Sequence, residues 1–162
     1  MQNLFLLAIA ILIAVIHFFI VKKRTRDTKA KLLELLLLYI LVVGVGLAGL
    51  MSFIGHVFFA DAIATKIGWA TGSPFQFEVG VGDGAWGVLG ILCIWFRKNF
   101  WLATGLGWSL FLIGAGYGHV RETLINSNYA PYNYGYILPD LLLPFLIIVL
   151  LILNFRLFRS PK

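Results

Sequence analysis

Five long apolar stretches constrain what this chain can fold into more than any other feature of its sequence. They cover about residues 4–21, 32–60, 79–96, 100–120 and 137–155. A helix of about 20 apolar residues crosses a hydrocarbon core of about 30 Å, and it satisfies its own backbone polar groups, as lipid requires. The sequence therefore predicts an all-α integral membrane bundle of five transmembrane helices, forming one domain over residues 1–162.

The composition excludes several other classes of protein. Hydrophobic residues make up 60% of the chain and charged residues 12%, whereas a soluble domain has about 25% charged residues. A chain this apolar is neither a soluble globular domain nor a disordered one. Its single cysteine, Cys93, has no second cysteine to pair with, which excludes a disulfide-stapled module.

The distribution of positive charge predicts the orientation. Eleven of the 13 Lys and Arg residues lie between the first two stretches, between the third and fourth, or after the fifth. Lys66 and Arg121 are the two that lie in the other loops. Since cytoplasmic loops are enriched in Lys and Arg, the N-terminus is predicted outside and the C-terminus in the cytoplasm. The basic residues then meet lipid head groups, so the expected partner is the bilayer and not nucleic acid.

Small residues mark where the helices are expected to pack. Helices in lipid approach closely through such residues, and three of the predicted helices carry a stripe of them that includes an ionisable side chain. We expect these side chains to face other helices rather than lipid, and the stripes also permit a homo-oligomer or a partner in a membrane complex. The stripes are Gly80, Asp83, Gly87 and Gly90; Gly49, Ser52 and His56; and Ala115, Gly116 and His119.

Histidines and carboxylates gather toward the predicted outer face. His56 and His119 lie at comparable depth near the outer boundary of their helices, and ionisable groups within a membrane usually mark a functional site. Imidazole and carboxylate ligands suit Zn, Fe or Mn, and His119 and Glu122 share a helical face at i, i+3. The sequence thus predicts an outward-facing transition-metal site made by His56, Asp83, His119 and Glu122, with Glu78 as a further ligand.

Three other interpretations stay open. His56 and His119, each preceded by glycine, could instead be axial ligands of a haem b in a redox protein, although the neighbouring carboxylates favour a metal ion. Asp, Glu and His side chains also serve ion or small-solute carriers. Alternatively, the cluster is an interhelical hydrogen-bond network in a non-catalytic accessory subunit. No catalytic motif assigns an enzymatic activity.

Several segments resemble a family of small bacterial inner-membrane proteins of unknown function. They are Ser73–Gly80, Asp83, Gly87–Gly90, Gly114–Glu122 and Asn128–Asn133. The resemblance implies a multi-pass protein of the bacterial cytoplasmic (inner) membrane, and it places Glu78, Asp83, His119 and Glu122 within the family's signature. In size and build the chain is also loosely similar to DoxX-like membrane proteins.

Overall fold

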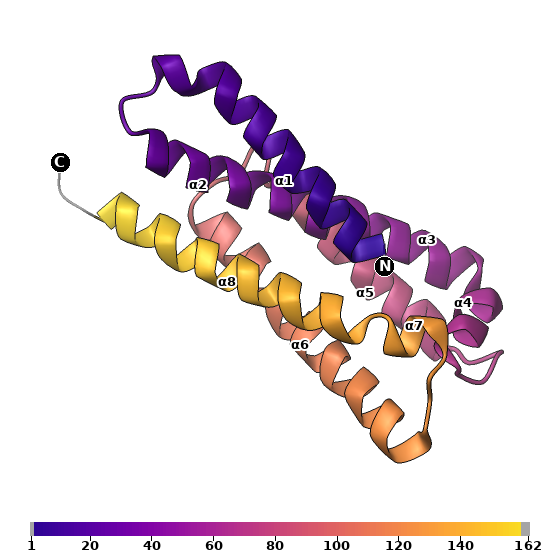
Figure 1. Cartoon of the computed structure of the whole chain (residues 1–162). Coiled ribbons are helices and arrows are strands. Elements are labelled where there is room, and N and C mark those ends of the chain that lie inside the picture. The colour runs from indigo at the N-terminus through magenta and orange to yellow at the C-terminus, as the bar shows by residue number, and fades with distance from the viewer. Residues whose placement is uncertain (1, 160–162) are drawn as a thin grey trace.

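The computed structural model of the protein describes residues 2–159 as a bundle of helices (Figure 1), and this range contains no strand. In chain order the elements are α1 (Gln2–Val21), η1 (Lys22–Arg24), α2 (Thr28–Tyr39), η2 (Ile40–Leu47), α3 (Ala48–Phe58), α4 (Ala60–Ile67), α5 (Phe75–Leu92), α6 (Asn99–Asn126), α7 (Pro131–Tyr134) and α8 (Ile137–Arg159). The prediction of an all-α membrane-type protein is confirmed at this level.

Four helical stretches within the described residues are long and apolar enough to cross a membrane. They are Asn3–Arg24, Thr28–Phe58, Asn99–Asn126 and Pro131–Phe155. The remaining predicted span corresponds to α5, which has 18 residues and begins four residues earlier than predicted. Its sequence is less apolar because it includes Gln76, Glu78 and Asp83 besides its glycines.

The second predicted helix is continuous from Thr28 to Phe58 but changes its winding in the middle. Asp27 caps its start by accepting a hydrogen bond from the backbone N–H of Ala30 at 2.9 Å. The segment η2 is π-helical, a wider winding that occurs mostly as short insertions in α-helices. From its length the sequence predicts that this helix tilts, extends or bends near its glycines, and two of these glycines lie in the π-helical segment.

Helix α5 packs tightly against η2 and α3 through glycines. A Cβ atom at Gly49 would lie 2.6 Å from the backbone oxygen of Asp83 and 2.8 Å from the backbone nitrogen of Gly87. These positions therefore need glycine for the two backbones to approach. The predicted packing of Asp83 and its glycine stripe against another helix is confirmed.

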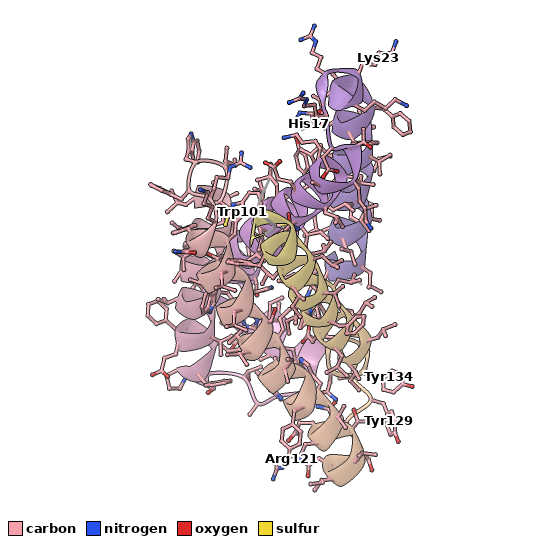
Figure 2. All side chains as sticks on the ribbon, turned by 90° about the vertical axis from the view of Figure 1, so that its left-hand side faces the viewer. His17, Lys23, Trp101, Arg121, Tyr129 and Tyr134 are labelled. Atoms are coloured by element: carbon pink, nitrogen blue, oxygen red, sulfur yellow. The ribbon has the colours of Figure 1, made fainter. Side chains whose placement is uncertain are left out.

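The two ends of the bundle differ. The α1–α2 turn and the end of α8 lie at one end, and α4 and α7 lie at the other, near the start of α1 (Figure 1). Lys23 marks the first end, and Arg121, Tyr129 and Tyr134 mark the second (Figure 2). Arg97 in the α5–α6 turn belongs to the basic end, since it pairs with Glu34 of α2 at 3.6 Å.

The aliphatic core is built mainly from α1, α2, η2 and α8. Its largest buried members come from α2, η2 and α8, and include Leu35, Leu37, Leu41, Leu143 and Ile147. Away from this core the bundle divides into two pairs of helices, because α3 packs with α5 and α6 packs with α8. The short helices α4 and α7, which the sequence analysis did not predict, contact each other across the far end.

Candidate functional site

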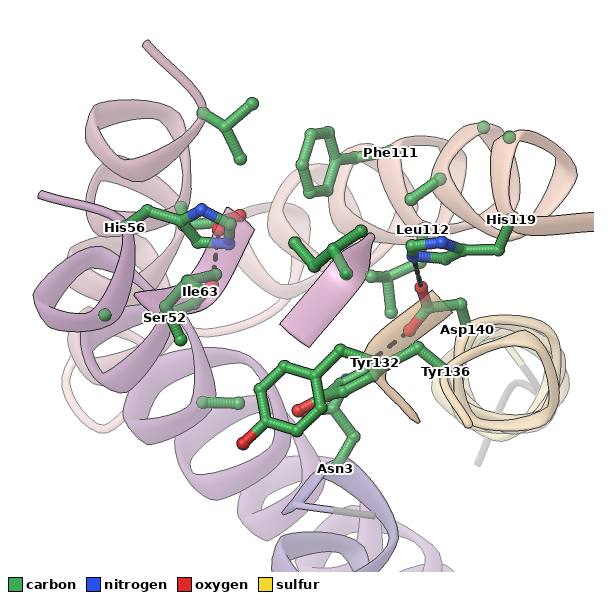
Figure 3. Close-up of a pocket in the computed structure, with 18 of the residues that line it drawn as sticks. Asn3, Ser52, His56, Ile63, Phe111, Leu112, His119, Tyr132, Tyr136 and Asp140 are labelled. Carbon is green, nitrogen blue, oxygen red and sulfur yellow. Dashed lines mark hydrogen bonds and ion pairs between the residues drawn. The ribbon is translucent and has the colours of Figure 1, made fainter. Parts of the chain in front are cut away.

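A cavity of about 790 Å³ lies between the α3–α5 pair and the α6–α8 pair (Figure 3). This volume is within the range of about 300–1,000 Å³ typical of small-molecule sites. Most of its wall is apolar, with Ile63 and Ile67 contributed by α4 and Trp108, Phe111 and Leu112 by α6. The cavity is thus suited to a molecule with a substantial apolar body.

The first polar group of the wall comes from α3 and α5. Ser52 and His56 are one turn apart on α3, and Gln76 and Asp83 are two turns apart on α5, so each pair shares a helical face. Ser52 Oγ donates a hydrogen bond to Asp83 Oδ2 at 2.5 Å. His56 Nδ1 lies 2.6 Å from Gln76 Oε1. Because an amide oxygen can only accept, His56 donates this hydrogen bond from Nδ1.

The second polar group comes from α6, α7 and α8. His119 Nδ1 lies 2.9 Å from Asn133 Oδ1, and His119 Nε2 lies 3.7 Å from Asp140 Oδ2. The other oxygen of Asp140 accepts a 3.5 Å hydrogen bond from Asn3 Nδ2, so the start of α1 also belongs to this group (Figure 3). Asp140 is 3% exposed, which makes it a buried carboxylate on the cavity wall.

Asn133 fixes which nitrogen of His119 carries a proton. Its Nδ2 donates to the backbone oxygen of Asn128 at 2.8 Å and to Thr123 Oγ1 at 2.9 Å. The amide is therefore oriented with Oδ1 toward His119, and His119 must donate from Nδ1. Its Nε2 then faces the Asp140 carboxyl group at 3.7 Å, where a protonated imidazole forms an ion pair with the carboxylate.

The two polar groups have the same chemistry. In each, an amide oxygen holds Nδ1 of a histidine, and a buried carboxyl group lies on the same wall of the cavity. Figure 3 shows His56 and Ser52 on one side of the cavity and His119 and Asp140 on the other. A bound molecule would thus meet hydrogen-bonding groups on both sides of an otherwise apolar space.

The residues predicted as metal ligands do not come together around one point. His56, Asp83 and His119 line the cavity, but on the two different sides. Glu122 lies at the rim, where its carboxylate accepts from Asn126 Nδ2 at 2.9 Å, and Glu78 is exposed in the first turn of α5. Within residues 2–159 no three His, Cys, Asp or Glu side chains are grouped so that they could hold a metal ion.

Four residues of the site were not singled out from the sequence: Asn3, Gln76, Asn133 and Asp140. A carboxylate at the position of Asp140 would by itself suit the N-terminal end of a helix, where it complements the helix dipole. It does lie in the first turn of α8, but its side chain faces His119. The sequence did carry a signal for Gln76, which precedes Gly80 by four residues and so continues the glycine stripe by one turn. The role of Asn133 depends on how a loop folds back, which no local pattern indicates.

Trp108 adds an unusual feature to the wall. It is buried and lines the cavity. Its indole Nε1 has no hydrogen-bond partner, and it is the one buried side-chain nitrogen or oxygen of the described residues in that state. Leaving such a donor unpaired costs about 1–3 kcal/mol.

The chain belongs to DUF6790, a family of unknown function whose family model matches residues 1–159. The expected membership of an uncharacterised family is therefore confirmed. No curated protein and no solved structure matches the chain.

Proposed function

We propose that this protein binds an amphipathic small molecule in the cavity and holds the polar part of that molecule between the two histidine–carboxyl groups. The observation that carries the proposal is the placement of His56 with Asp83 and His119 with Asp140 on the two sides of one largely apolar cavity. Buried ionisable groups are costly in a membrane unless they serve a pathway or a site. Such groups would supply orientation and specificity, while the apolar wall would supply most of the binding energy.

Exchange of a proton is part of the proposed chemistry. His119 Nε2 and the Asp140 carboxyl group lie 3.7 Å apart, and each can accept a hydrogen bond from a ligand or, when protonated, donate one. This property suits a protein that carries or presents a protonatable molecule. It corresponds to the small-solute carrier among the interpretations of the sequence.

We further propose that α5 is a fifth transmembrane helix and that the cavity lies toward the outer side of the membrane. The polar side chains of α5 that lower its hydropathy include Gln76 and Asp83, which are buried against the rest of the bundle. Lipid tolerates such residues when they face the protein interior. The distribution of Lys and Arg supports an outer N-terminus and a cytoplasmic C-terminus in a bacterial inner membrane.

A direct test is to identify what co-purifies with the protein. The protein is purified in a mild detergent or in nanodiscs, extracted with organic solvent and analysed by mass spectrometry. We expect a near-stoichiometric amphiphile that is lost in His56→Ala and His119→Ala. His17→Ala is the matched control, because His17 bonds to the Tyr39 hydroxyl at 2.9 Å and does not line the cavity. No enriched molecule in the wild type, or equal amounts in all variants, would contradict the proposal.

The metal and haem interpretations have their own test on the same samples. Metal analysis and an absorption spectrum would show a near-stoichiometric metal or a haem Soret band if His56 and His119 hold such a cofactor. Under the proposal, neither is found. A metal or Soret band that disappears in both His56→Ala and His119→Ala would replace the amphiphile by a cofactor. The accessory-subunit interpretation instead predicts neither cofactor nor ligand, and a partner protein in pull-downs.

A further inference from the structure

We infer that the cavity opens sideways into the bilayer between α5 and α6, and that its ligand is a single-chain amphiphile whose apolar chain leaves through this opening. The inference rests on the proposed function and adds the class of the ligand and its route. This proposed opening is named the α5–α6 gap. The cavity-lining residues that we assign to its border are Phe75 of α5 and Leu110, Phe111, Gly114 and Gly118 of α6.

The α5–α6 gap results from the way these helices diverge. Near the basic end they are joined, since Trp101 Nε1 donates to the backbone oxygen of Cys93 at 2.8 Å. The ring of Trp86 also lies over Gly107. Beyond this point the two helices separate toward the cavity end (Figures 1 and 2). The cavity lies where the two helices have separated, since both contribute residues to its wall.

Two glycines of α6 lie in that space. A Cβ atom built at Gly114 or Gly118 would meet nothing within 4 Å, and both residues line the cavity. Gly114 is 15 residues from the start of α6, or about 22 Å along the helix axis. The hydrocarbon core of a bilayer is about 30 Å thick. With the start of α6 at one face of this core, Gly114 lies at the depth of the lipid chains.

The border of the gap is apolar and exposed. Leu110 is 63% exposed, Phe111 37% and Phe75 50%, although all three line the cavity. Arg121 and Glu122, which pair at 3.7 Å, lie farther along α6 at the outer rim. An acyl or isoprenoid chain in the gap would thus pass over apolar side chains and two glycines, with its polar head deeper in the cavity.

Other sides of the cavity are closed by specific contacts. Toward the outer end, Asn128 Nδ2 donates to the backbone oxygen of Ile67 at 2.9 Å and ties the loop before α7 to α4. Between α1 and α8, Asn3 bonds to Asp140. Between α3 and α5, the glycine contact at Gly49 leaves no room for a side chain. The α5–α6 gap is therefore the route by which the acyl or isoprenoid chain of the ligand leaves the cavity.

Spin-labelled stearic acids test the inference in nanodiscs. One probe carries the nitroxide near the carboxyl group, and a second carries it near the end of the chain. For the wild type we expect an immobilised component in the electron paramagnetic resonance spectrum of both probes. Leucine at Gly114 or Gly118 should reduce this component at least fivefold by filling the gap. Gly82→Leu is the matched control, since Gly82 also has open space but does not line the cavity.

Each outcome decides between the claims. Loss of the signal in Gly114→Leu and Gly118→Leu, with retention in Gly82→Leu, supports the gap. An immobilised head-labelled probe that depends on His119 but not on Gly114 or Gly118 overturns the gap and leaves the proposed function standing. If no probe is immobilised by the wild type, this ligand class is wrong, and the mass spectrometry above still judges the proposed function.

Dimer formation abolished by Gly114→Leu, with no change in probe binding, would assign the glycines to a second copy of the chain. If leucine impairs folding, the smaller substitutions Gly114→Val and Gly118→Val replace it, and the same loss of the immobilised component is expected.

Discussion

Among single residues, Ser52 and Asp83 form the shortest contact of the candidate site, a 2.5 Å hydrogen bond between α3 and α5. Interhelical hydrogen bonds in membrane proteins contribute about 0.6 kcal/mol on average and at most about 1.7 kcal/mol. We expect a double-mutant cycle of Ser52→Ala and Asp83→Ala, measured by reversible unfolding in mixed micelles, to give a coupling free energy in this range. A coupling free energy of zero would show that the bond does not hold the two helices together.

The orientation of Asn133 leads to a second prediction at the residue scale. Because its Nδ2 is occupied by Asn128 and Thr123, its Oδ1 can only accept, and His119 should be protonated at Nδ1. Nitrogen-15 spectra of histidine-labelled protein, assigned with His17→Ala and His56→Ala, should show this tautomer for neutral His119. In Asn133→Leu the preference should disappear. A neutral His119 protonated at Nε2 in the wild type would contradict the hydrogen-bond scheme.

At the scale of helices, the contact of α3 with α5 depends on residues that lack side chains. Gly49→Ala would place a Cβ atom 2.6 Å from the backbone oxygen of Asp83, so one helix must move. Overpacking of this kind costs about 1–3 kcal/mol, and we expect a loss of that size in the free energy of unfolding. Gly114→Ala is the control, since its Cβ has open space, and it should change the stability little. Equal effects of the two substitutions would mean that backbone approach is not what stabilises the pair.

The contact between α3 and α5 was predictable from the sequence, whereas other features of the helices were not. The stripe of Gly80, Gly87 and Gly90 predicted that Asp83 faces another helix, because small residues at helical spacing have one main use in lipid. The π-helical winding of Ile40–Leu47 could not be predicted, since it satisfies backbone bonds in a pattern that no local residue preference selects. The short helices α4 and α7 were missed because their four to eight residues carry too little periodicity.

For the whole molecule, the apolar stretches were sufficient to predict the long helices but not the cavity. Periodicity indicates which face of a helix is buried, and it does not give the angle at which α5 and α6 separate. That angle decides that His56 and His119 lie on two sides of a space instead of around one ion. Asp140 could not be assigned to the site for the same reason, since its position in the first turn of α8 explains a carboxylate without any reference to α6.

The orientation of the molecule gives the last prediction. Single cysteines are introduced at Thr25, Thr71, Asn99 and Ser127 in a Cys93→Ser background, and intact bacterial cells are treated with a membrane-impermeant maleimide. These residues lie at the α1–α2 turn, before α5, after α5 and after α6. If α5 spans the membrane, positions 71 and 99 must be on opposite faces. We expect labelling at 71 and 127 in intact cells, and at 25 and 99 only after permeabilisation. Labelling of 71 and 99 together would show that α5 does not cross, and the reverse pattern would place the cavity on the cytoplasmic side, where its ligand would come from the inner leaflet.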